Sequence, residues 1–197
     1  MIGLLDEAER VGHDAALPVV RGASLMRKGS LAILEDIAGR NFTTAQQRRQ
    51  WADEAEQIMR AADDLWQLHE VVFLHCRTRL HDDGLDGLSP FVIEAVEVAA
   101  RCENRPIFAE ALLIAAEFAA RCDEHDVADE IVDLADSLTT SIWNRRWLTA
   151  HQPNHVERLE RAMAAHRGEP ACEIDMAEER TLWLLTTITS ETSHIEH

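Results

Sequence analysis

The segment from Ala45 to Leu80 is the feature that most restricts the fold of this chain. It contains no proline and no glycine, and its apolar residues recur every three or four positions. They are Trp51, Ala55, Ile58, Met59, Ala62, Leu65, Trp66, Leu68, Val72, Phe73, Cys76 and Leu80. This spacing gathers apolar side chains on one side of a helix. The segment therefore predicts one long central helix of roughly 50 Å, at about 1.5 Å per residue.

Breaks rich in Gly, Pro and Asn divide the rest of the chain into shorter helical patterns. Residues 1–21 are ambiguous, and helices are expected at about 22–40, 89–103, 107–122, 127–148, 153–167 and 174–188. Ser89-Pro90 is typical of a helix start, with a capping serine followed by proline in the first turn. The run "TLWLLTTITS" is rich in β-branched residues, but Ala, Glu and Arg precede it, so we interpret it as helix.

No other segment alternates like a strand, and the sequence predicts an all-α bundle of about seven helices. We expect a single domain over residues 1–197, with a subdivision near 82–89 as the alternative, because "HDDGLDGLSP" is the clearest loop.

The charge balance limits the class of partner. Asp and Glu number 36 against 19 Lys and Arg, which gives a net charge of -17. Such a chain repels phosphate groups and anionic lipids, so we expect neither a nucleic-acid nor a membrane partner. The longest apolar run, from Ala111 to Ala116, is too short for a bilayer span.

The start of the chain and its cysteines indicate a cellular location. The apolar residues Met1–Leu5 run directly into Asp6-Glu7 without the pattern of a secretory signal, and none of the four cysteines forms a C-x-x-C pair. Reduced thiols and a cytoplasmic location are expected.

Two ten-residue segments resemble each other. "AVEVAARCEN" (95–104) and "AAEFAARCDE" (115–124) are identical at six positions, and each ends a predicted helix. Either they are two alanine-rich packing faces or they are a degenerate helical repeat. Because consecutive helices run antiparallel, Cys102 and Cys122 should lie roughly 20 Å apart. That separation excludes a disulfide between them, which needs Cα atoms within about 7 Å.

Two pairs of carboxylates have spacing suited to a divalent cation. Glu94-x-x-Glu97 and Glu130-x-x-Asp133 each place two acids on one helix face. Two such helices facing each other would offer the oxygen ligands that Mg²⁺ prefers. The alternative is that these are solvated carboxylates on helix surfaces.

The segments "VIEAVEVAA" and "DEIVDLADSL", which carry these pairs, resemble the metal-binding helices of MazG-like all-α nucleoside triphosphate pyrophosphohydrolases. The resemblance implies Mg²⁺-dependent cleavage of (d)NTPs between the α and β phosphates. Glu94, Glu97, Glu130 and Asp133 match the four metal ligands of that family.

Trp143-Asn-Arg-Arg-Trp147 is the densest aromatic cluster. Trp143 and Trp147 share a helix face, and Arg145 and Arg146 lie on or beside it. Such a group is typical of an interface, although core tryptophans covered by arginine would give the same pattern.

These observations favour a non-enzymatic cytoplasmic interaction or regulatory protein that requires no cofactor. It would act through an acidic or Trp/Arg surface, with a protein partner or by self-association as a homodimer. The first alternative is the Mg²⁺-dependent pyrophosphohydrolase. The second is a sensor that binds a small molecule between its helices.

Overall fold

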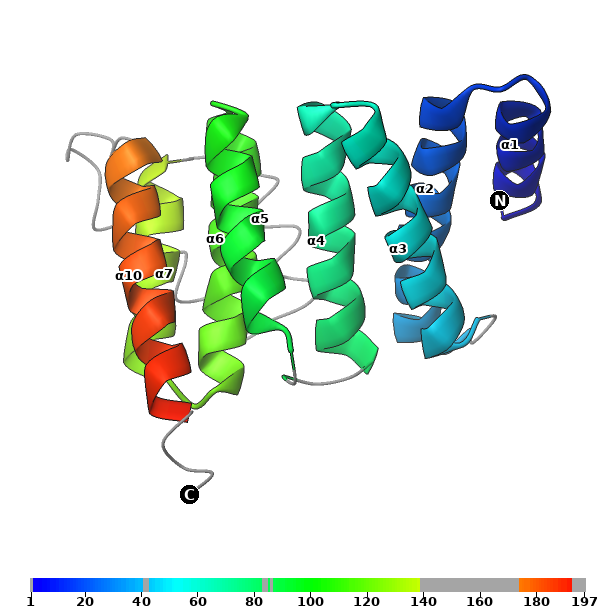
Figure 1. Cartoon of the computed structure of the whole chain (residues 1–197). Coiled ribbons are helices and arrows are strands. Elements are labelled where there is room, and N and C mark those ends of the chain that lie inside the picture. Colours follow the sequence, from blue (N-terminus) through cyan, green and yellow to red (C-terminus); the bar gives the residue numbers. More distant parts are fainter. Residues whose placement is uncertain (1, 41–42, 83–84, 86, 139–173, 193–197) are drawn as a thin grey trace. The chain divides into compact units, whose positions relative to one another are not determined.

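A computed structural model describes residues 2–40, 43–82, 85, 87–138 and 174–192. Within these ranges the chain forms eight helices and no strand (Figure 1). They are α1 (Ile2–Asp14), α2 (Pro18–Ile37), α3 (Ala45–Ala61), α4 (Leu65–Asp82), α5 (Ser89–Arg101), α6 (Arg105–Arg121), α7 (His125–Leu138) and α10 (Ile174–Thr192). The all-α prediction is confirmed, and "TLWLLTTITS" lies in α10. None of the described helices has the length and apolarity needed to span a membrane.

The prediction of one long central helix is wrong. The chain turns at residues 62–64, so the segment forms two helices, α3 and α4. Asp63 adopts a left-handed backbone with φ 52°, and the Asp64 side chain accepts a hydrogen bond of 3.0 Å from the backbone N–H of Gln67. Aspartate tolerates the left-handed conformation and caps a new helix well. The pair Asp63-Asp64 therefore makes a turn without proline or glycine.

Between the described helices, the same three-residue connection occurs at four places, residues 15–17, 62–64, 102–104 and 122–124. The middle residue has a positive φ each time, and these residues are Ala16, Asp63, Glu103 and Asp123. In the last connection the backbone N–H of Glu124 donates to the carbonyl of Ala119 at 3.0 Å, the long-range bond that closes a helix end. The two similar ten-residue segments thus end in the same type of helix corner.

These segments are also packing faces. Ala95, Ala99 and Ala100 are buried in α5, and Ala115, Ala116 and Ala119 are buried in α6. Cys102 and Cys122 are partly buried at the two corners, and neither forms a disulfide.

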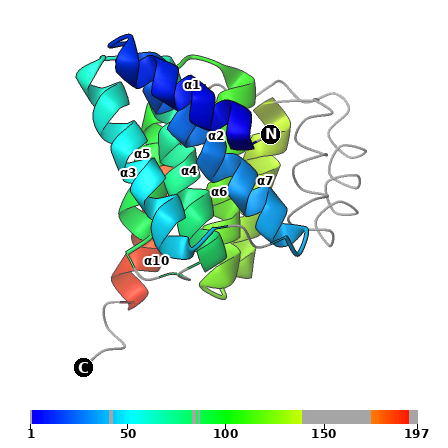
Figure 2. The same ribbon diagram turned by 90° about the vertical axis from the view of Figure 1, so that its right-hand side faces the viewer.

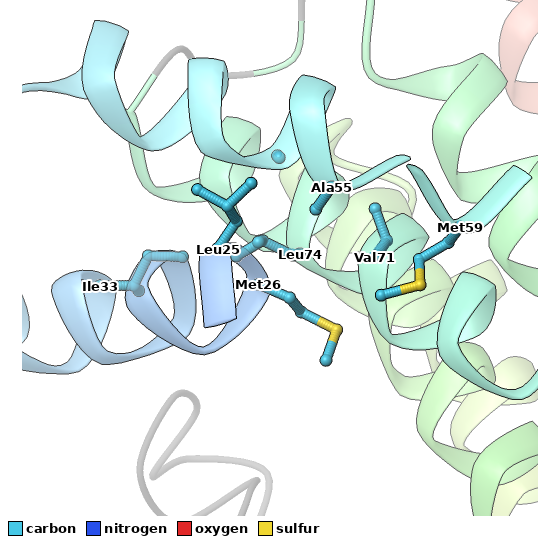
Figure 3. Packing of buried hydrophobic residues seen from close by; sticks show 8 residues of the cluster. Leu25, Met26, Ile33, Ala55, Met59, Val71 and Leu74 are labelled. Atoms are coloured by element: carbon cyan, nitrogen blue, oxygen red, sulfur yellow. The ribbon is translucent and has the colours of Figure 1, made fainter. Parts of the chain in front are cut away.

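The chain divides into two compact units, residues 1–91 and 92–197. In the first unit, α2 packs on α1, α3 and α4, and Figure 2 shows α1 and α2 side by side. Glycines permit the close approach. A Cβ atom at Gly22 would lie 2.6 Å from the Met59 Cε atom, and one at Gly29 would lie 2.7 Å from a Leu74 methyl group. Apolar side chains from α2, α3 and α4 form the core between these helices (Figure 3): Leu25, Met26, Ile33, Ala52, Ala55, Met59, Val71 and Leu74.

In the second unit, α6 packs against α7 and α10. Helix α6 is apolar nearly all round, and Phe108, Leu112 and Ile114 are fully buried. Such a helix belongs at the centre of a bundle. Both neighbours turn one face to solvent, and exposed side chains on those faces are described below.

Candidate functional site

The four predicted magnesium ligands lie on two helices, Glu94 and Glu97 on α5 and Glu130 and Asp133 on α7. Glu130 on α7 is held by Arg180 on α10, whose Nε lies 2.5 Å from Glu130 Oε1 and whose second nitrogen lies 3.0 Å from Oε2. Three ligand-type atoms come within 4.8 Å of one another at only one place in the described ranges, and this group is Asp36, His81 and Asp82. None of Glu94, Glu97, Glu130 and Asp133 belongs to it. One of the four, Glu130, therefore has an arginine as its partner, and the magnesium site stays a prediction.

Glu97 lies near a different carboxylate. Burial raises the pKa of Glu178 on α10, and the negative charges of Asp175 and Glu97 raise this pKa further. Asp136 on α7 is affected in the same way. Burial, with a smaller contribution from Asp133, raises the pKa of Asp136 to about 7. Its Oδ2 atom is buried without a hydrogen-bond partner. The second unit therefore holds acids that repel one another.

The Asp36–His81–Asp82 group is built at one end of the first unit, where α2 and α4 end and α3 begins. His81 Nε2 lies 2.7 Å from Asp36 Oδ2. Arg48 of α3 grips Asp82 through two nitrogens, with Nε at 3.0 Å from Oδ2, and its NH2 group lies 3.4 Å from Asp36 Oδ2. Arg48 also donates to Thr43 Oγ1 at 3.1 Å.

The Arg48 guanidinium already pairs with the carboxylates of the Asp36–His81–Asp82 group. A cation placed among Asp36, His81 and Asp82 would have to displace the Arg48 guanidinium, which already neutralises Asp82. The geometry is thus that of an ion-pair network that joins α2, α3 and α4, rather than that of an open metal centre.

Lys28 is the only lysine of the chain, and its side chain is only 5% exposed. Its Nζ atom lies 2.5 Å from carboxylate oxygens of Asp6 and Glu9 on α1, and it sits 5.7 Å from the ring centre of Trp51 on α3. Burial disfavours the ammonium group, but the hydrogen bonds to Asp6 and Glu9 outweigh burial and raise the Lys28 pKa. A charged ammonium group that forms two ion pairs stabilises the packing of α1, whereas a nucleophilic lysine must be neutral.

Two further groups lack the activation that catalysis needs. Burial raises the thiol pKa of both Cys102 and Cys122, whereas a reactive cysteine has a lowered one. His75 is buried, stacks on Phe91 at 5.1 Å, and has Nε2 2.8 Å from Glu56 Oε2. Burial lowers the pKa of His75, despite the opposing effect of Glu56. We therefore interpret Cys102, Cys122 and His75 as residues that contribute to packing.

Among the described residues of the second unit, the most exposed aromatic side chain lies on α10. Trp183 is 55% exposed, and the Arg180 guanidinium carbon lies 4.3 Å from its ring centre. Met176 is 59% exposed. Residues 176, 180, 183 and 187 follow a four–three–four spacing, so Met176, Arg180, Trp183 and Thr187 share one face of the helix. We call these four residues the α10 face.

The predicted Trp/Arg surface, Trp143, Arg145, Arg146 and Trp147, lies outside the described residues. The α10 face is a second combination of tryptophan and arginine, which sequence reasoning missed. The sequence pattern that could have indicated it is Arg180-x-x-Trp183, because side chains three residues apart on a helix are neighbours.

Comparison of the chain with protein-family models, curated proteins and solved structures finds no match. The resemblance to MazG-like pyrophosphohydrolases therefore rests on the two quoted helix segments alone.

Proposed function

We propose that this protein is a non-enzymatic helical interaction protein that binds a basic protein segment through the α10 face. The observation that carries the proposal is the exposed Trp183 ring, covered on one side by Arg180, which Glu130 holds in place. Tryptophan and arginine are the residues most enriched among those that dominate binding energy at protein interfaces.

The geometry supports binding because the face is preorganised. Glu130 bonds two nitrogens of Arg180, so the guanidinium and the ring beneath it lose little freedom when a partner arrives. The exposed Met176 side chain extends the apolar area along the same face. A flexible methionine adapts to the shape of a partner.

The charge of the neighbouring helix points to the chemistry of the partner. Asp126, Asp129, Glu130 and Asp133 recur at three and four residues and so share one face of α7, which packs on α10. With a net charge of -17, the protein attracts basic segments and speeds their association at low salt. A basic, amphipathic partner would place its apolar side on Trp183 and its cations beside the α7 acids.

The proposed setting is the cytoplasm, in line with the reduced thiols that the sequence leads us to expect.

Binding to a panel of Lys/Arg-rich amphipathic peptides tests the proposal, with proteins captured from a lysate providing further sequences for the panel. Trp183→Ala and Arg180→Ala should each weaken the best binder by about tenfold or more. Trp66→Ala is the matched control, because Trp66 is 51% exposed but lies in the first unit, and it should change the affinity by less than about twofold. Equal losses in Trp183→Ala and Trp66→Ala, or no binding by any peptide, would contradict the proposal.

A turnover assay separates this function from the enzymatic alternative. Incubation with (d)NTPs and Mg²⁺ should release no pyrophosphate above background. Turnover that disappears in Glu97→Gln and in Asp133→Asn would instead establish the pyrophosphohydrolase.

A further inference from the structure

A second surface, on the first unit, exposes apolar side chains without an assigned role. Leu4 and Val11 of α1 are 76% and 41% exposed, and Val20, Leu34 and Ile37 of α2 are 41%, 54% and 50% exposed. We call these five residues the hairpin face. We propose that the hairpin face binds the same face of a second copy of this chain, which makes the protein a homodimer.

The apolar residues of α1 and α2 lie on the same side of the hairpin. Lys28 marks the opposite side, because it reaches Asp6 on α1 and also lies over Trp51 of α3. At about 100° per residue, Leu4 and Val11 are rotated more than 100° around α1 from Asp6.

The same reasoning applies to α2. Leu34 is nine residues from Leu25, which corresponds to a rotation of about 180° around the helix. Leu25 is 1% exposed and belongs to the core between α2, α3 and α4. Leu34 therefore projects away from that core, and Val20 shares its direction because the two are fourteen residues apart.

The spacing on both helices suits helix-on-helix packing. Leu4, Ala8, Val11 and Ala15 follow one another at intervals of four, three and four residues along α1 and the residue after it. Along α2 the corresponding series is Val20, Ala23, Arg27, Ser30, Leu34 and Ile37. This heptad-type spacing is the pattern by which two helices interlock side chains. Two hairpins that meet through such rows would form a four-helix contact.

The charges around the hairpin face favour a second copy over a basic partner. A net charge of -17 opposes self-association unless the contact surface is locally balanced. Here each exposed arginine has its own carboxylate. Arg10 bonds Glu7 at 2.5 Å and Asp14 at 2.8 Å, Arg27 lies 3.0 Å from Glu70, and Arg40 pairs with Glu35.

The row Glu7–Arg10–Asp14 also complements itself. Under a two-fold rotation, a shift of about one helical turn places Arg10 of one copy against Glu7 or Asp14 of the other. The row lies beside Leu4 and Val11 on α1, at the rim of the apolar area. The hairpin face thus offers an apolar centre with a self-complementary rim.

Sedimentation velocity of the full chain over a concentration series tests the proposal. The wild-type protein should reach dimer mass by about 0.1 mM, a concentration at which even weak specific dimers form. Leu34→Glu should raise the dimer dissociation constant about tenfold or more. Met176→Glu is the matched control, because it puts the same charge on a comparably exposed apolar site of α10, and it should leave the constant within about twofold.

Two further measurements separate loss of the dimer contact from loss of folding. Circular dichroism and the thermal midpoint of Leu34→Glu should match the wild type, since its side chain is half exposed. Arg10→Glu should weaken the dimer, and mixing it with the Glu7→Arg/Asp14→Arg variant should restore association as a heterodimer. A wild type that stays monomeric, or a dimer that Leu34→Glu and Arg10→Glu leave intact, overturns the proposal. Added salt should strengthen this dimer, whereas it should weaken binding at the α10 face, so the two proposals fail separately.

Discussion

Arg48 and Asp82 form a two-pronged ion pair that is almost closed to water, with side chains 5% and 3% exposed. It joins the start of α3 to the end of α4, and the Asp36–His81 pair ties the end of α2 to the same point. A buried pair of this kind is expensive to break, because the surviving charge stays buried without its partner.

We predict that Arg48→Ala lowers the free energy of unfolding by about 3 kcal/mol or more, because it strands the Asp82 carboxylate. The measurement is denaturant unfolding followed by circular dichroism. Arg27→Ala is the control, since Arg27 is 60% exposed and its pair with Glu70 faces water, so a small change is expected. The double variant Arg48→Met/Asp82→Leu should recover most of the loss. A loss as small as that of Arg27→Ala would show that the ion pair does not lock the helices.

Replacement of Lys28 by methionine should loosen α1 in particular. The change removes the ammonium that bonds Asp6 and Glu9 but keeps a side chain of similar length. Because the Asp6 side chain is 58% exposed, its carboxylate regains water, and the expected loss of stability is only about 1–2 kcal/mol.

Native-state hydrogen exchange checks this prediction. Amides of α1 should exchange faster in Lys28→Met, while those of α3 and α4 around Met59 and Leu74 keep their protection. Uniform acceleration in all four helices would argue against a specific role for Lys28 in holding α1.

The stability of the protein should fall as the pH rises towards neutrality, because of Asp136. Burial raises the pKa of Asp136 to about 7 from the 3.8 of a free aspartate, so the folded state binds a proton that the unfolded state has already lost. Between these two values the folded state therefore loses stability as the pH increases, and above about 7 the full penalty is present.

Asp136→Asn should remove that penalty. We expect it to stabilise the protein by about 1–3 kcal/mol at pH 8, since one pKa unit corresponds to about 1.4 kcal/mol and the side chain keeps some contact with water. Near pH 5 the gain should fall to about a third of that value, and it should vanish only below about pH 3.8, where Asp136 is protonated in both states. Unfolding curves from pH 5 to 8 measure this effect, with the exposed Asp126→Asn as the control. An equal gain at both ends of the range would exclude titration of Asp136 as the cause.

The sequence predicted most of the helices because their signals are local. Asn104 and Pro106 predict the start of α6. In the structure the Asn104 side chain caps that helix by accepting a hydrogen bond of 3.1 Å from the N–H of Ile107. The turn at Asp63 escaped prediction, because the apolar spacing continues across it and no proline or glycine marks it.

The functional groups were harder to predict, because they depend on how distant segments pack. Asp36 and His81 are 45 residues apart in the chain, and no pattern links them before α2 and α4 are placed side by side. For the same reason, the Glu130-x-x-Asp133 pair looked open to a metal ion. Only the packing of α10 on α7 brings Arg180 to Glu130.

Hydrogen–deuterium exchange of the full chain, alone and with the tightest-binding basic peptide, is the most direct test of the proposed function. We predict slowed exchange along α10 from Met176 to Thr187 and along the acidic face of α7, with little change in α1 and α2. Protection confined to the first unit, with α10 unchanged, would contradict the account.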